Sequence, residues 1–109
     1  MLVPTSAVAD STPVGPLPRP TVTTVSTTKG SLVSLAVARR AASSGLVWRI
    51  ARPLDGRIVR QVGEADVGSA VVLVFRVVGR GRTSITLALT RGDSSPRAVR
   101  AVRYDLRAT

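Results

Sequence analysis

From residue 21 onward, apolar and polar side chains alternate in short runs separated by Gly, Ser, Pro or Asp. Val33, Leu35 and Val37, for example, alternate with Ser or Ala, and alternate side chains of a strand point to opposite faces of a sheet. Many of these apolar residues are β-branched, which also favours strands. The pattern predicts seven strands, over residues 21–28, 32–38, 47–51, 57–62, 70–78, 83–90 and 98–107.

The fifth predicted strand has a different pattern, because Arg76 is the only polar residue between Ala70 and Val78. Both faces of this strand are therefore apolar, and burial of both by other parts of a protein is favourable. Two interpretations remain open: this strand lies in the middle of a sheet beneath a neighbouring loop, or it exposes an apolar patch that a partner uses.

The first twenty residues have a different composition from the rest, since they hold five of the seven prolines. Proline at this density disfavours both helix and sheet, so we expect an extended tail over residues 1–20 and one domain over residues 21–109. The triplet Ala7-Val8-Ala9 has the small-x-small form of a signal-peptidase site. It is either the remnant of a secretion signal or a chance triplet in an alanine-rich chain. We expect a secreted or envelope protein, with a cytoplasmic location as the alternative. We expect no membrane-spanning helix, because no apolar run approaches 18 residues.

Length and composition further restrict the classes of function that are compatible with the chain. A chain of 109 residues accommodates one domain, and this one contains no Cys and no His. Disulfides, the usual zinc sites and the commonest general base at neutral pH are therefore excluded. The sequence predicts a binding protein rather than an enzyme, with no catalytic residue, no metal and no cofactor.

The net charge of +10 arises from 16 basic and six acidic residues, and Lys29 is the only lysine. Codon usage in a GC-rich genome also produces such an arginine bias. The charge is compatible with nucleic acid, an anionic membrane or an acidic protein. With three aromatic residues in the chain, we expect no specific nucleic-acid recognition and only weak, salt-sensitive binding to phosphates. The arginines expected to form one basic stripe are Arg76, Arg80, Arg82, Arg97, Arg100, Arg103 and Arg107.

Seven short strands with a single tryptophan, Trp48, in the third are typical of an immunoglobulin-like antiparallel β-sandwich, although the cysteine pair of antibody domains is absent. We expect Trp48 to be largely buried between the two sheets. Function in such scaffolds tends to reside in the loops.

Three of the loops, in their order and spacing, resemble those of the chagasin-like inhibitors of cysteine peptidases. In that family a Gly precedes an alternating strand, which is followed by a loop of sequence Asn-Pro-Thr-Thr-Gly, an aromatic residue, one further residue and Trp. Here Gly30 precedes residues 31–37, and the next loop reads Ala-Ala-Ser-Ser-Gly-Leu-Val-Trp over residues 41–48. Ser43, Ser44, Gly45 and Trp48 are in register with the family pattern.

The family's other two loops have weaker counterparts. Gly68 and Ser69, within residues 66–69, take the place of a glycine-rich turn, and Arg91-Gly92-Asp93 takes the place of Arg-Pro-Trp. The resemblance covers about 80 residues, from Thr28 to the C-terminus. It implies a β-sandwich whose three loops fill the cleft of a papain-like cysteine peptidase. The peptidase-binding residues it implies are Ser43, Ser44, Gly45, Leu46, Gly68, Ser69, Arg91, Gly92 and Asp93.

The departures from the family pattern modify this expectation. Ala41 and Ala42 replace Asn-Pro and remove a fixed φ, and the third loop lacks the Trp of the family. We therefore expect weaker affinity or a different target. The alternatives are a secreted or envelope adaptor that kept the scaffold without inhibiting, and, third, a basic nucleic-acid-binding module. We expect the protein to be a monomer.

Overall fold

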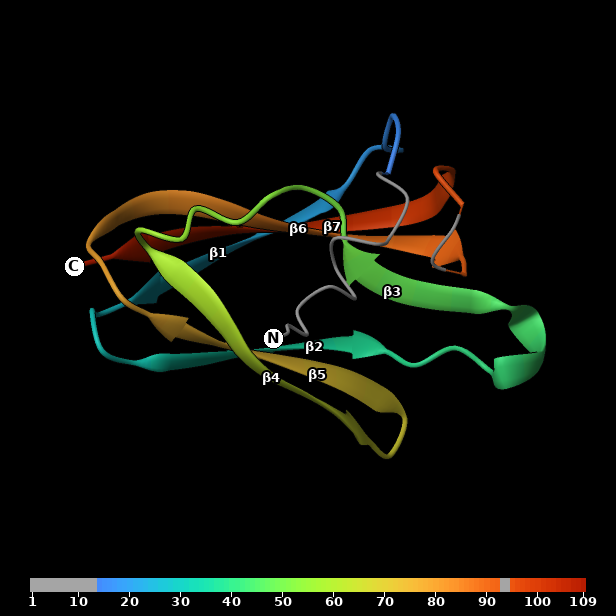
Figure 1. Cartoon of the computed structure of the whole chain (residues 1–109), viewed down its shortest axis with the longest axis horizontal. Coiled ribbons are helices and arrows are strands. Elements are labelled where there is room, and N and C mark those ends of the chain that lie inside the picture. The colour runs from blue at the N-terminus through green and yellow to red at the C-terminus, as the bar shows by residue number, and fades with distance from the viewer. Residues whose placement is uncertain (1–13, 93–94) are drawn as a thin grey trace, which may run out of the picture.

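The computed structural model describes residues 14–92 and 95–109, which form a sandwich of two β-sheets (Figure 1). One sheet has the strand order β1-β7-β6-β3 and the other has the order β2-β5-β4. A 3-10 turn, η1 (Ala42–Ser44), lies between β2 and β3. The strands are β1 (Thr21–Thr27), β2 (Leu32–Ala38), β3 (Leu46–Ile50), β4 (Val59–Val67), β5 (Ala70–Val77), β6 (Gly81–Arg91) and β7 (Ala98–Ala108).

The pairing of the strands is that of an immunoglobulin-like fold. β1 runs parallel to β7, and the other neighbouring strands are antiparallel. Consecutive strands from β2 to β3 and from β5 to β6 change sheets, while β4–β5 and β6–β7 are hairpins. The predicted all-β sandwich of seven strands is confirmed.

The core lies between the sheets and consists mainly of aliphatic side chains from β2, β5, β6 and β7. Phe75, Ile85 and Leu87 are completely buried, and Leu106 is 2% exposed. Tyr104 of β7 packs at the edge of this core, and its partial burial raises the pKa of the phenol. The alternation of the sequence predicts which side chains point into the core, because successive side chains of a strand point to opposite faces.

The fourth strand differs from its prediction, which was residues 57–62. β4 continues to Val67, so that Asp66 and Val67, expected in a loop, pair with Val71 and Ala70 of β5. The pairing register shifts between Gln61 and Gly63, and a bulge of this kind interrupts the alternation by which a strand is recognised. The second half of β4 is also exposed and largely polar, because β4 is an edge strand.

β5 is the middle strand of its sheet, which is one of the two arrangements expected from its apolar sequence. Its inward side chains are buried, whereas Val72 and Val74 on its outer face are partly exposed. The strand with two buried faces is instead β6, where every residue from Ile85 to Thr90 is buried.

The outer face of β6 is covered in part by residues 14–20, which form neither helix nor strand. Val14 is 9% exposed and clusters with Ala51 and Ala88, with Leu17 partly buried against them. The Arg52 guanidinium donates hydrogen bonds to the carbonyl oxygens of Val14 and Gly15, both at 3.0 Å. Residues 14–20 of the predicted tail are therefore attached to the sandwich, whereas residues 1–13, with the Ala7-Val8-Ala9 triplet, lie outside the described residues. None of the helical segments in the described part of the chain is long and apolar enough to cross a membrane.

A candidate protein-binding surface at one end of the sandwich

Three connections lie at the same end of the sandwich: β2–β3 (residues 39–45), β4–β5 (residues 68–69) and the described part of β6–β7 (residues 92 and 95–97). The backbone N–H of Arg39 donates to the carbonyl oxygen of Ser69 at 2.8 Å, which joins the first two loops. Leu46 pairs with Arg91, which sets the third loop beside the first. In Figure 1 these loops lie toward the right and the C-terminus toward the left. We name this end the loop end.

The structure therefore brings eight of the nine residues implied by the family resemblance to the loop end. Leu46 is the first residue of β3 and Arg91 the last of β6, rather than members of loops. Asp93 lies outside the described residues. The residues at the loop end are Ser43, Ser44, Gly45, Leu46, Gly68, Ser69, Arg91 and Gly92.

Each of the three loops contains one glycine in the left-handed region of φ. The φ angles are 69° at Gly45, 59° at Gly68 and 70° at Gly92. A Cβ added at any of the three would meet no atom within 4 Å. The backbone of each loop is therefore bent in a way that favours glycine, and another protein can approach it closely.

One exposed valine lies close in the sequence to each of the three loops. Val47 is 39% exposed beside the first loop, Val67 is 58% exposed before the second, and Val99 is 53% exposed after the third. Exposed apolar residues are unremarkable singly, but their grouping around one set of loops is typical of a protein-binding surface.

Hydrogen bonds of Ser44 hold the first loop in place. Its Oγ donates to the carbonyl oxygen of Ala41 at 2.6 Å and accepts from the N–H of Leu46 at 3.2 Å. Its own backbone N–H donates to the same carbonyl at 2.9 Å. These bonds restrain a loop that lacks the Asn-Pro of the family pattern, and they explain why a Ser rather than an arbitrary polar residue fits here.

Trp48 fixes the root of the same loop. Its indole N–H donates to the carbonyl oxygen of Ala38, the last residue of β2, at 2.9 Å. The side chain packs against the core with intermediate exposure, in keeping with the prediction that most of Trp48 is buried. The remaining exposure arises because β3 is the edge strand of its sheet.

Arg49 and Thr90 hold the third loop. The Arg49 guanidinium donates from Nε to Thr90 Oγ1 at 3.0 Å and from Nη2 to the carbonyl oxygen of Ser95. The fully buried Thr90 hydroxyl in turn donates to the carbonyl oxygen of Gly92 at 2.9 Å. The N–H of Gly15 donates to the carbonyl oxygen of Pro96 at 2.7 Å, so the N-terminal segment also braces this loop.

Sequence reasoning missed these supports, because Arg49 was counted only as a charge and Thr90 only as a strand residue. The two partners of Arg49, the Thr90 hydroxyl and the Ser95 carbonyl, are 41 and 46 positions away in the sequence. No local pattern identifies such pairs.

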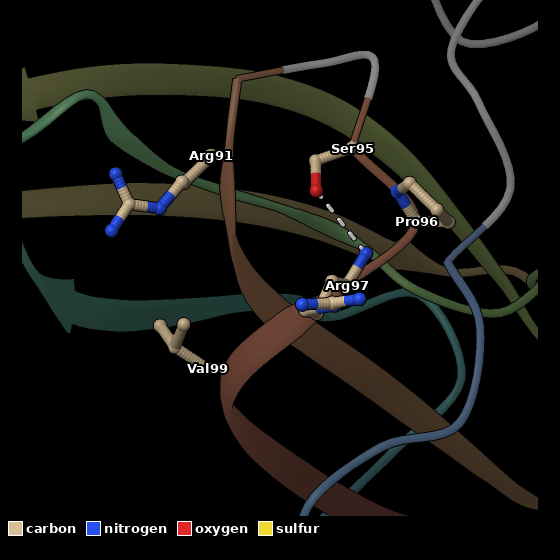
Figure 2. A pocket seen from close by; sticks show the side chains of 5 residues that line it. All are labelled: Arg91, Ser95, Pro96, Arg97 and Val99. Carbon is tan, nitrogen blue, oxygen red and sulfur yellow. Dashed lines mark hydrogen bonds between the residues drawn. The ribbon is translucent and has the colours of Figure 1, made fainter.

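A shallow hollow of about 320 Å³ lies beside the third loop. Figure 2 shows Arg91 and Val99 extending to the same side of the ribbon, with Ser95, Pro96 and Arg97 on the following turn. The register shift between Leu89 and Thr90 is of the kind that re-aims side chains at strand ends. Apolar surface flanked by guanidinium groups can receive an acidic or aromatic side chain of another protein. The hollow is lined by Arg91, Ser95, Pro96, Arg97 and Val99.

Within the described residues no three His, Cys, Asp or Glu side chains come together as a metal site would require. What the loop end offers is accessible glycine backbone, serine hydroxyls, valine side chains and guanidinium groups. These groups suit recognition of another protein.

Comparison with known proteins shows similarity to solved structures. No protein-family model matches the chain, and no curated protein sequence matches it. The fold is similar to that of the cysteine protease inhibitor EhICP2 from Entamoeba histolytica, with a TM-score of 0.62. The two chains are 15% identical, and the similarity covers 84% of this chain and 99% of the other. At this identity the similarity shows the immunoglobulin-like sandwich fold alone.

Proposed function

We propose that the protein inhibits papain-like cysteine peptidases by inserting the three loops of the loop end into the active-site cleft. The observation that carries the proposal is the convergence of three left-handed glycines with open space around them, Gly45, Gly68 and Gly92. The proposal is supported by the fold, which is similar to that of a cysteine protease inhibitor.

In this mechanism the three loops divide the cleft between them. The central β2–β3 loop brings the backbone at Gly45 and Leu46 close to the catalytic cysteine, because a glycine there presents no Cβ. The β4–β5 turn, through Gly68 and Ser69, contacts one wall of the cleft. The β6–β7 loop contacts the other wall, where Arg91 can reach a carboxylate or stack on an aromatic ring at the rim.

Restraint of the loops before binding favours inhibition. Ordering a mobile loop on binding costs about 0.5–1.5 kcal/mol for each side chain that is immobilised. Here Ser44 and Trp48 restrain the first loop, and Arg49 and Thr90 restrain the third, in the free protein. A restrained loop also resists adopting the extended conformation that a peptidase needs in order to cleave it.

The third loop lacks the Trp of the family pattern, and Trp is a residue type that often dominates interface energy. The valines around the loops and the hollow beside Arg91 provide the remaining apolar contact. We therefore place the affinity below that of loops with the full family pattern.

The experiment is an inhibition assay on a panel of papain-like peptidases with variants at both ends of the sandwich. Gly45→Trp should raise the inhibition constant by more than about tenfold, because an indole at this position would obstruct the approach of the loop to the peptidase cleft. The matched control is Gly30→Trp, since Gly30 also has a positive φ, 96°, and open space around it but lies at the opposite end.

A second pair of variants tests the charge at the rim. Arg91→Glu should weaken inhibition, whereas Arg57→Glu makes the same change in charge on a side chain that is 91% exposed at the opposite end and should not. If the unmodified protein binds no papain-like peptidase at micromolar concentration, the inhibitor proposal fails and the adaptor interpretation replaces it.

A further inference from the structure

The end of the sandwich opposite the loop end carries a second concentration of side chains with one chemistry. It is formed by the start of β4 and β6, the end of β5 and β7, and the β1–β2 and β5–β6 turns. Six exposed cations lie there, and we name them the basic cap: Lys29, Arg60, Arg76, Arg80, Arg82 and Arg107.

The single basic stripe expected from the sequence is divided by the fold. Arg97 and Arg100 lie by the loop end, at the start of β7. Arg76 lies on the outer face of the three-stranded sheet, because its neighbours in β5, Phe75 and Val77, point into the core. Residues from outside the stripe, Lys29 and Arg60, complete the basic cap instead.

Four members of the basic cap form two pairs of like charges directly opposite each other. Arg60 is the register partner of Arg76, and Arg82 is the register partner of Arg107. One pair lies on the outer face of each sheet, since Val59 and Leu106 beside them point inward. Like charges at directly opposed positions of a sheet are destabilising, so both pairs cost stability in the isolated protein.

The acidic groups near this end are already engaged. Asp55 forms an ion pair with Arg57 at 3.2 Å, and its hydrogen bonds with Arg57 lower the pKa of that carboxyl. Asp105 accepts from Arg103 at 3.0 Å and from Ser84 at 2.9 Å. Among the described residues, these two ion pairs are the ones observed, and neither includes a member of the basic cap.

We infer that the basic cap is a docking surface for an anionic lipid membrane. Clusters of four to eight Lys and Arg side chains are of the size that binds acidic phospholipid surfaces, and phosphate suits the fork of the guanidinium group. Among the described residues no ion pair involves either of the two opposed arginine pairs, and anionic headgroups can supply that counter-charge. Leu32, 56% exposed beside Arg76, adds an apolar side chain that can enter the headgroup region.

The distribution of these cations favours a membrane over nucleic acid. They lie on the outer faces of both sheets, whereas a single strand is bound in one groove lined with stacking rings. The hollow beside Arg82 and Arg107 is lined by no aromatic residue. Phe75 is buried, and Trp48 and Tyr104 pack against the core, so no aromatic residue is available there to stack on a base. This docking surface lies at the opposite end from the proposed inhibitory loops and does not depend on their function.

The test is sedimentation of the full chain with vesicles of phosphatidylcholine alone or phosphatidylcholine mixed with phosphatidylglycerol. We expect binding to the mixed vesicles to exceed binding to the neutral ones by more than about tenfold. Raising the salt from about 0.1 M to about 1 M shortens the Debye length from about 10 Å to about 3 Å and should release the protein.

The decisive variant is the double substitution Arg60→Glu with Arg82→Glu, which converts both opposed arginine pairs into pairs of opposite charge. It should lose vesicle binding while its melting temperature rises, so that a loss of binding cannot come from unfolding. The control is Arg39→Glu with Arg40→Glu, which makes the same change in net charge in exposed side chains at the loop end and should retain binding.

Three results would overturn the inference. Equal binding to neutral and anionic vesicles would show that the charge of the lipid is irrelevant. Equal loss of binding in the two double variants would show that net charge, rather than the basic cap, controls the interaction. Binding of a short DNA duplex with no binding of the anionic vesicles would assign the basic cap to nucleic acid instead.

Discussion

At the scale of single residues, Trp48 connects the fold to the candidate site. Its ring packs against the core, and its N–H bonds to the last carbonyl of β2 at the root of the β2–β3 loop. The sequence predicted the strand that holds this tryptophan. It could not predict the acceptor, because the acceptor is a backbone carbonyl whose position depends on where β2 ends. The partners of Arg49 also depend on the fold, because Thr90 and Ser95 are 41 and 46 positions away in the sequence.

Replacement of Trp48 by Ala should destabilise the protein by about 3 kcal/mol, the lower limit for large aromatic residues, because the ring is only partly buried. Trp48→Phe keeps an aromatic ring and removes the N–H, and should cost roughly 1 kcal/mol. Thermal or urea unfolding measures both values, and amide exchange in residues 39–45 should increase in each variant. Unchanged exchange in Trp48→Phe would show that the indole hydrogen bond does not hold the loop.

At the scale of elements, β2 was predictable from its alternating side chains, whereas the full length of β4 was not. β2 has the bounds that its periodicity predicted. β4 does not, because the shift after Gln61 breaks its alternation and its second half faces solvent. The segment over residues 14–20 was predicted from its prolines as a tail, since composition shows that a segment cannot form a strand but not whether one side chain finds a pocket.

Val14 is the residue with which that segment packs on β6, and its substitution tests the attachment. Val14→Asp would bury a carboxylate among Ala51 and Ala88 and should cost at least about 2 kcal/mol. The control is Val22→Asp, on a side chain that is 45% exposed in β1. Unfolding measures the cost. Amide exchange in residues 95–97 should also increase in Val14→Asp alone, because Gly15 bonds to Pro96. Equal melting temperatures for the two variants would return residues 14–20 to the role of a dispensable tail.

At the scale of the whole molecule, the sequence supplied the fold class and the order of the loops but not the division of charge between the two ends. Strand periodicity determines which residues share a face, and the immunoglobulin-like topology determines which loops share an end. The net charge of +10 is a property of composition alone. Only the pairing of the strands shows that Arg60 opposes Arg76 and that Arg82 opposes Arg107.

Because the loop end and the basic cap lie at opposite ends of the sandwich, binding at one should leave the other accessible. If both proposals hold, protein bound to anionic vesicles should inhibit a papain-like peptidase as strongly as protein in solution. Gly45→Trp should then lose inhibition and keep vesicle binding, and the Arg60→Glu, Arg82→Glu double variant should show the reverse. The test measures inhibition constants with and without vesicles, and sedimentation with vesicles, for the unmodified protein and for both variants. Competition between vesicles and peptidase for the unmodified protein would mean that the two partners share one surface, contrary to the arrangement of charge and glycine described above.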